Sequence, residues 1–156
     1  MKISWPKLIY SFLICEGAGI LGSFFTISAI PTWYATLVKP SIAPPNWLFG
    51  PMWVALYALM AISLYLVWTS GSERKKKALI IFGIQLFLNA IWSPVFFGLQ
   101  SPGLGLIIII LLWGSIIFTI WEFYKISKLA SLILIPYLLW VSFATLLNYF
   151  IWQLNS

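Results

Sequence analysis

The feature that most constrains this chain is a series of five apolar stretches, each long enough to cross a lipid bilayer. A helix spans the hydrocarbon core with about 20 mostly apolar residues. The stretches that reach this length are, approximately, residues 8–30, 46–68, 78–97, 104–124 and 132–152. Because lipid offers the backbone no hydrogen-bond partner, each stretch is expected to be a helix. The sequence therefore predicts an all-α integral membrane protein, a bundle of five transmembrane helices.

Composition supports this prediction. Of the 156 residues, 62% are hydrophobic and 8% are charged, whereas soluble domains average about 45–50% apolar and about 25% charged residues. The first stretch is expected to remain as a spanning helix, because it is long and lacks the small-residue cleavage pattern of a signal peptide. We expect residues 1–156 to form a single membrane domain.

The residue inventory excludes several kinds of site. The chain contains no histidine and no aspartate, so the commonest metal ligand is absent and a Ser-His-Asp triad is impossible. The single cysteine, Cys15, cannot form an intrachain disulfide. The net charge of +6 comes from loops between apolar stretches, so we attribute it to membrane topology and expect no nucleic-acid partner.

The distribution of positive charge predicts the orientation. With five spans, the N-terminus and the loops at 69–77 and 125–128 lie on one side of the membrane. Eight of the nine cations lie there: Lys2, Lys7, Arg74, Lys75, Lys76, Lys77, Lys125 and Lys128. Only Lys39 lies opposite. Because Lys and Arg in short loops stay cytoplasmic, we expect a cytoplasmic N-terminus and an external C-terminus; an anionic-lipid site at 74–77 is the second interpretation.

The segment WYATLVKPSIAPPNW, residues 33–47, interrupts the apolar pattern with prolines and aromatic rings. Proline lacks an amide donor and disfavours helix in the residue before it, so no helix is expected through Lys39-Pro40 or Pro44-Pro45. Two interpretations stand at this point. The segment is either a rigid connector or a lid over a binding site.

Helical periodicity places polar and aromatic residues on inward faces of three spans. The third span carries Gln85, Asn89, Trp92 and Phe96; the second carries Trp53 and Tyr57; the fifth carries Tyr137, Trp140, Ala144 and Leu147. Uncharged amides are costly in hydrocarbon unless paired, so Gln85 and Asn89 are expected to face other helices. The rings should converge beneath residues 33–47, although ordinary helix packing by large rings explains the same pattern.

Two further features concern the interior of the spans. Glu16 shares a face with Gly19 and Ser23, a pattern of small residues that permits close helix approach. An intramembrane carboxyl group is by default a functional residue, but protonation and hydrogen bonding at a helix contact is the alternative. Pro94 and Pro136 are expected to bend the third and fifth helices.

Three quoted segments carry a family resemblance. The segments WYATLVKPSIAPPNWLFGPMWVALY (33–57), LNAIWSPVFFG (88–98) and PYLLWVSFATLLNYFIWQLN (136–155) resemble the TspO/MBR family of tryptophan-rich sensory and translocator proteins. The resemblance covers nearly the whole chain. It implies a five-helix bundle, often a homodimer, that binds tetrapyrroles such as protoporphyrin IX and haem in a pocket under the first loop. Sterols bind some family members.

The resemblance also implies site residues. The ligand-binding positions of the family fall here on Tyr34, Trp53, Asn89, Trp92, Trp140, Phe143, Ala144 and Leu147. The lid over the pocket, loop 31–45, carries Trp33, Lys39, Pro40, Pro44 and Pro45. No catalytic residue, metal site or required cofactor is implied, and protoporphyrin IX or haem is expected as a ligand.

The chain departs from the family pattern at two positions. Ile108 stands where many members carry an aspartate in the fourth span, which removes a polar contact of the pocket. In the sterol-recognition pattern near the C-terminus, Gln153 replaces the basic residue that follows Tyr149, so sterol binding is not expected.

The sequence favours a receptor or carrier for porphyrin-type tetrapyrroles, with a role in stress or tetrapyrrole regulation, in a bacterial cell membrane. Without histidine, haem iron has no ordinary axial ligand, so binding should depend on the macrocycle. Two alternatives remain. One is a light- or oxidant-dependent porphyrin-degrading enzyme, and the other is a regulatory membrane protein that acts through protein partners.

Overall fold

The computed structural model describes residues 3–156, in which all regular structure is helical. The helices, in chain order, are α1 (Trp5–Ala29), α2 (Trp33–Thr36), η1 (Asn46–Leu48), α3 (Phe49–Trp68), α4 (Lys75–Ser93), η2 (Pro94–Gly98), α5 (Pro102–Tyr124), α6 (Lys128–Ile133) and α7 (Ile135–Leu154). Five helical segments are long and apolar enough to cross a membrane. The predicted fold class, an all-α bundle of five spanning helices, is confirmed.

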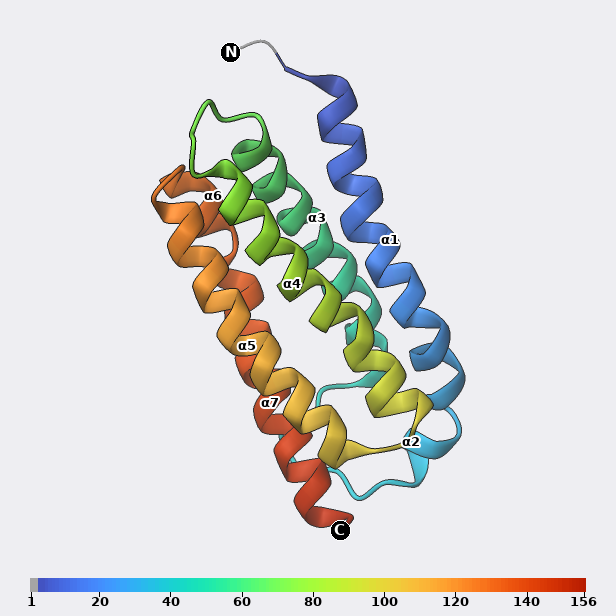
Figure 1. Ribbon diagram of the computed structural model, residues 1–156. Helices are drawn as coiled ribbons and strands as arrows, with labels where there is room; N and C mark the ends of the chain where they lie inside the picture. The colour runs from blue at the N-terminus through green and yellow to red at the C-terminus, as the bar shows by residue number, and fades with distance from the viewer. Residues whose placement is uncertain (1–2) are drawn as a thin grey trace.

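The long helices lie nearly parallel in one bundle (Figure 1). Helix α1 packs against α3 and α4, α4 packs against α5, and α5 packs against α7, which contacts α3 and completes the ring. The N-terminal end of α1, the α3–α4 connection and α6 lie at one end of the bundle. Helix α2 and the C-terminus lie at the other end (Figure 1).

The spans extend beyond several of the predicted limits. The second is Asn46–Trp68, as the sequence predicts, and the third runs from Lys75 to Gly98. The first starts earlier than expected, at Trp5, because the proline after it lies in the first turn, where its missing N–H costs no helical hydrogen bond. The fifth is interrupted at Leu134, between α6 and α7, just before Pro136 in the first turn of α7.

Pro94 changes the geometry of the third span. Residues Pro94–Gly98 form a π-helical turn, in which the Leu99 amide donates to the Pro94 carbonyl at 2.9 Å. The turn places Phe96 and Phe97, both buried, beneath the 33–47 segment. The backbone then reverses through Gln100, whose φ is 51°, a left-handed conformation.

No helix passes through Lys39-Pro40 or Pro44-Pro45, as the sequence predicts, and short helical turns form on either side of these prolines. Trp33–Thr36 form a helical turn and Asn46–Leu48 a 3-10 turn, while the proline-rich stretch between them has no helix. The first turn forms because Trp33 and Tyr34 pack on Phe96, with ring centroids 5.7 and 6.5 Å from it.

A buried chain of hydrogen bonds joins three spans at the centre of the bundle. The Tyr57 hydroxyl donates to Asn89 Oδ1 at 2.6 Å, and Asn89 Nδ2 donates to the Tyr137 hydroxyl at 2.6 Å. The Tyr137 hydroxyl in turn donates to Gln85 Oε1 at 2.9 Å. The two amides therefore face other helices, as the sequence predicts, and each finds a partner from α3 or α7.

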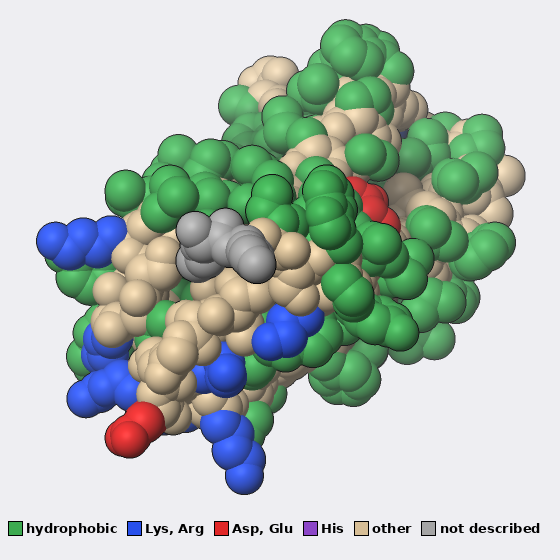
Figure 2. All heavy atoms as spheres, turned by 90° about the horizontal axis from the view of Figure 1, so that it is seen from above, with side chains coloured by type: hydrophobic (Ala, Val, Ile, Leu, Met, Phe, Trp, Pro, Cys, Tyr) green, Lys and Arg blue, Asp and Glu red, His purple; other side chains and the backbone are tan. Residues whose placement is uncertain are grey.

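The described cations other than Lys39 lie at the end of the bundle that carries the start of α1. Figure 2, viewed from that end, shows Lys and Arg side chains gathered on it, with hydrophobic side chains covering the flanks. At this end the buried Glu122 accepts from Lys77 at 3.1 Å and from Lys125 at 2.7 Å, which ties α4 to α5. The expectation for Lys2 falls outside the described residues.

Replacing Tyr137 with Phe should destabilise the bundle. The substitution leaves Asn89 Nδ2 and Gln85 Oε1 without their partner in a buried site, at a cost of about 1–3 kcal/mol. Thermal unfolding in detergent, followed by circular dichroism, should show a lower midpoint. Tyr149→Phe, at an exposed position, is the matched control and should unfold like the parent. Equal midpoints for both variants would contradict a stabilising role for the chain of hydrogen bonds.

Candidate functional site

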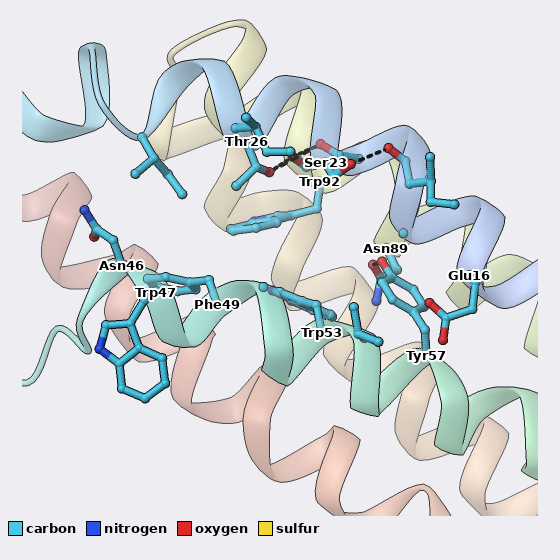
Figure 3. Close-up of a pocket in the computed structure, with 18 residues that line it drawn as sticks. Glu16, Ser23, Thr26, Asn46, Trp47, Phe49, Trp53, Tyr57, Asn89 and Trp92 are labelled. Carbon is cyan, nitrogen blue, oxygen red and sulfur yellow. Dashed lines mark hydrogen bonds between the residues drawn. The ribbon is translucent and has the colours of Figure 1, made fainter.

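A cavity with a volume of about 410 Å³ lies between α1, α3 and α4. We call it the α1–α3 cavity. Figure 3 shows the rings of Trp92, Phe49 and Trp53 in the space between α1 and α3. Glu16 and Tyr57 lie at one end of this space and Asn46 at the other. Small-molecule sites usually measure about 300–1,000 Å³, so this cavity has the size of a ligand site.

The α1–α3 cavity opens on the flank of the bundle rather than at its end. Ile20, Ile27 and Val54 line it, and their side chains are 57%, 70% and 59% exposed. In a five-span membrane protein this flank faces the hydrocarbon of the bilayer. An apolar ligand can therefore reach the cavity from the lipid.

Close helix approach closes one end of the cavity. Gly19 of α1 lies directly against the Tyr57 ring of α3, so that a Cβ at this position would overlap the ring. On the α4 side, Ser93 Oγ donates to the Gly22 carbonyl at 2.8 Å and bonds Thr26 Oγ1 at 2.6 Å. Of the predicted small pair, Gly19 makes a helix contact, but Ser23 bonds its own helix, at the Ile20 carbonyl.

A second, smaller space lies deeper in the bundle, between α3, α4 and α7 beneath α2. This inner cavity measures about 50 Å³. Thr26, Phe49, Trp53 and Trp92 line both cavities, so the two rings of Trp53 and Trp92 stand where the spaces meet. The inner cavity is nearly filled by side chains, and it has room for only part of a large ligand.

The predicted ligand-binding residues divide between the two cavities. Tyr34, Trp53, Trp92, Trp140, Ala144 and Leu147 line the inner cavity. Asn89 instead lines the α1–α3 cavity, where its side chain also belongs to the buried hydrogen-bond chain. Phe143 lines neither; its ring packs 5.6 Å from that of Trp140.

The five predicted lid residues line neither cavity. Trp33 covers Phe96 and Phe97, and Lys39 Nζ lies 4.9 Å from the centre of the Tyr34 ring. Pro40, Pro44 and Pro45 line none of the cavities. Asn155 at the end of α7 holds the segment in place, since it exchanges two 2.9 Å hydrogen bonds with the Val38 backbone. Burial raises the pKa of the Tyr34 hydroxyl above its usual value, so this hydroxyl stays neutral.

Sequence reasoning missed several residues that line the cavities. Phe49 lies one helical turn before Trp53, so the same periodicity could have identified it. Asn148 holds Trp92 in position, because its Oδ1 accepts from the indole Nε1 at 3.2 Å while its Nδ2 donates to the Pro102 carbonyl at 2.7 Å. Ile108, which stands in place of the family aspartate, is half-buried in α5 and lines neither cavity.

The walls of the two cavities are mostly apolar. Aromatic rings and aliphatic side chains form most of the walls, and the polar atoms are mainly hydroxyl and amide groups bonded to one another. Within residues 3–156 no group of three or more potential metal ligands comes together. Trp140 lines the inner cavity, and its buried indole Nε1 has no hydrogen-bond partner within residues 3–156.

Comparison with known proteins agrees with the resemblance carried by the three segments. The model of the TspO/MBR family matches residues 11–153. The chain is 48% identical over 150 residues to the tryptophan-rich protein TspO of Archaeoglobus fulgidus, covering 96% of this chain and 97% of that protein. It is 41% identical over 138 residues to the human translocator protein, covering 86% and 82% of the two chains. It is 30% identical over 155 residues to the tryptophan-rich sensory protein of Cereibacter sphaeroides, covering 99% and 95%.

Gly19→Ala should destabilise the α1–α3 contact that closes the cavity. The added methyl group would overlap the Tyr57 ring, and overpacking of this kind costs about 1–3 kcal/mol. Gly17→Ala, in the same helix, meets nothing within 4 Å and serves as the matched control. Because alanine favours helix over glycine by about 1 kcal/mol, the control should unfold at the parental temperature or above it. If Gly19→Ala unfolds like Gly17→Ala, the helix contact is looser than described.

Proposed function

This chain belongs to the TspO/MBR family, and from that premise we propose that it is a membrane receptor or carrier for porphyrin-type tetrapyrroles, protoporphyrin IX or haem. The observation that carries the proposal is the joined pair of aromatic cavities, which meet at Trp53 and Trp92. The tetrapyrrole body would lie in the α1–α3 cavity against these rings, with one edge in the inner cavity.

Physical chemistry supports a flat apolar ligand at this place. Stacking between aromatic rings adds about 0.5–1.5 kcal/mol per pair beyond the burial of area. Trp53, Trp92 and Phe49 offer such surfaces at the junction of the cavities. The predicted ligand-binding set, Tyr34, Trp53, Asn89, Trp92, Trp140, Phe143, Ala144 and Leu147, is proposed to contact the ligand or to shape its site. Loop 31–45 is proposed as the lid.

The proposed orientation follows from the charges at the two ends of the bundle. The cationic end, with the α3–α4 connection and α6, is assigned to the cytoplasm of a bacterial cell, and the lid end with Lys39 to the outside. A reporter enzyme that is active only outside the cytoplasm should therefore be active when it is fused after Ser156 and inactive when it is inserted at 69–74. The reverse pattern of activity would overturn the assignment.

Two further expectations from the family complete the proposal. A second copy of this chain is the proposed protein partner, which light scattering of the purified protein would detect as a dimer. Sterols are not proposed as ligands, because Gln153 takes the place of the basic residue in the sterol-recognition pattern.

Fluorescence titration of the purified protein with protoporphyrin IX in the dark tests the function directly. Binding should quench tryptophan emission, because Trp47, Trp53 and Trp92 all line the α1–α3 cavity. Trp53→Ala removes a ring at the junction, and Ala144→Leu fills the inner cavity, so each should weaken binding at least about tenfold, which is about 1.4 kcal/mol. Haem should bind within about tenfold of protoporphyrin IX, since no histidine is present to ligate iron.

Trp121→Ala is the control for these variants, because Trp121 is exposed at the far end of α5. Unchanged binding in both Trp53→Ala and Ala144→Leu would contradict the proposal that the tetrapyrrole binds in these cavities. The titration is repeated under light with analysis of the products. Light-dependent conversion of the macrocycle would favour the porphyrin-degrading enzyme over the receptor or carrier.

A further inference from the structure

Glu16 stands apart from the other two carboxyl groups of the described chain. Glu73 is exposed in the connection between α3 and α4. Glu122 is buried, but two lysines bond it at 3.1 and 2.7 Å. Within residues 3–156, Glu16 makes neither an ion pair nor a hydrogen bond, although it lies inside α1. A carboxyl group in this position requires an explanation, because ionisable residues within membrane spans are usually paired or mark a ligand path.

The position of Glu16 places it far from the charges at the ends of the bundle. It is the twelfth residue of the α1 span, which starts at Trp5, and so lies roughly 17 Å from the start of the helix at a rise of 1.5 Å per residue. The nearest cation along α1, Lys7, is nine residues away, or about 14 Å. No basic side chain is among the residues that line the α1–α3 cavity. Within residues 3–156, no basic side chain therefore serves as a counter-ion for Glu16.

The hydroxyl groups around Glu16 are committed elsewhere. The Tyr57 hydroxyl donates to Asn89, and the Ser23 hydroxyl donates to the Ile20 carbonyl. Figure 3 shows Glu16 reaching from α1 toward α3, beside the Tyr57 ring and facing the cavity. A ligand in the cavity would thus meet the Glu16 carboxyl group, whose oxygens accept no hydrogen bond from residues 3–156, beside the Tyr57 ring.

From this arrangement we propose that the α1–α3 cavity binds a protonated amine carried on a flat apolar body, with Glu16 as its counter-ion. The apolar body would lie against Trp53 and Trp92, and the ligand would arrive from the bilayer through the opening lined by Ile20 and Val54. The ammonium group would donate to Glu16 in a charge-assisted hydrogen bond, which is strongest where water is excluded. The neighbouring tyrosine ring adds a cation–π contribution.

This inference goes beyond the proposed tetrapyrrole site and does not depend on it. The ionisable side groups of protoporphyrin IX are propionates, which a carboxylate at position 16 repels. Both ligands would lie against the rings of Trp53 and Trp92, but only the amine proposal requires Glu16, at the opposite end of the larger cavity. The two ligands can therefore be separated by a substitution at position 16.

The test uses two fluorescent probes that differ only in the charged group, 1-pyrenemethylamine and 1-pyrenemethanol. The full-length protein is placed in nanodiscs of phosphatidylcholine at neutral pH, and energy transfer from tryptophan to pyrene reports binding. The parent protein should bind the amine at least about tenfold more tightly than the alcohol, because only the amine can pair with Glu16. In Glu16→Gln this preference should fall to about twofold or less, while the affinity for the alcohol stays unchanged.

Glu73→Gln removes a carboxyl group in an exposed connection and should keep the parental preference. Glu16→Asp retains the charge with a shorter side chain, so it should keep part of the preference even if Glu16→Gln does not fold. Protoporphyrin IX binding by Glu16→Gln should match or exceed that of the parent, which separates this inference from the proposed function. A parent protein without preference for the amine, or a full preference retained in Glu16→Gln, would overturn the proposal.

Discussion

Hydrocarbon gives a buried polar group no water to bond to, and this constraint governs the placement of the polar side chains in the bundle. Tyr57, Asn89, Tyr137 and Gln85 satisfy one another across α3, α4 and α7. Ser63 of α3 donates to the Ala130 carbonyl at 2.7 Å and so joins the broken last span to the bundle. Each of these bonds connects different helices. Polar pairing, added to apolar packing, thereby specifies which helices are neighbours.

Pro94 shapes the end of the bundle that carries α2. Pro94 replaces regular α-helical bonding with a π-helical turn, and this turn presents Phe96 and Phe97 to the rings of α2. The segment after α2 is then held by two hydrogen bonds to Asn155 at the end of α7. The conformation of the segment after α1 thus depends on contacts between parts of the chain that are distant in sequence.

The two cavities have different characters although they share the rings of Trp53 and Trp92. The inner cavity, about 50 Å³, is nearly filled by side chains, and Trp140, which lines it, has a buried indole N–H without a partner among residues 3–156. The α1–α3 cavity, about 410 Å³, opens toward lipid and has a carboxyl group at one end. The mostly aromatic and aliphatic walls of both cavities suit flat apolar molecules, and the few polar groups would discriminate between such molecules.

Sequence alone determined the class of fold and the family, because the length and polarity of a span are local properties on which the bilayer acts directly. It also identified the inward faces, since the period of a helix places Gln85 and Asn89 on one side. Only the tertiary structure decided that Trp33–Thr36 form a helical turn, that the aromatic site is divided into two cavities and that Asn148 positions Trp92. Those features depend on contacts between residues far apart in the chain, such as Gly19 against Tyr57, which set the distance between helices and hence the space between them.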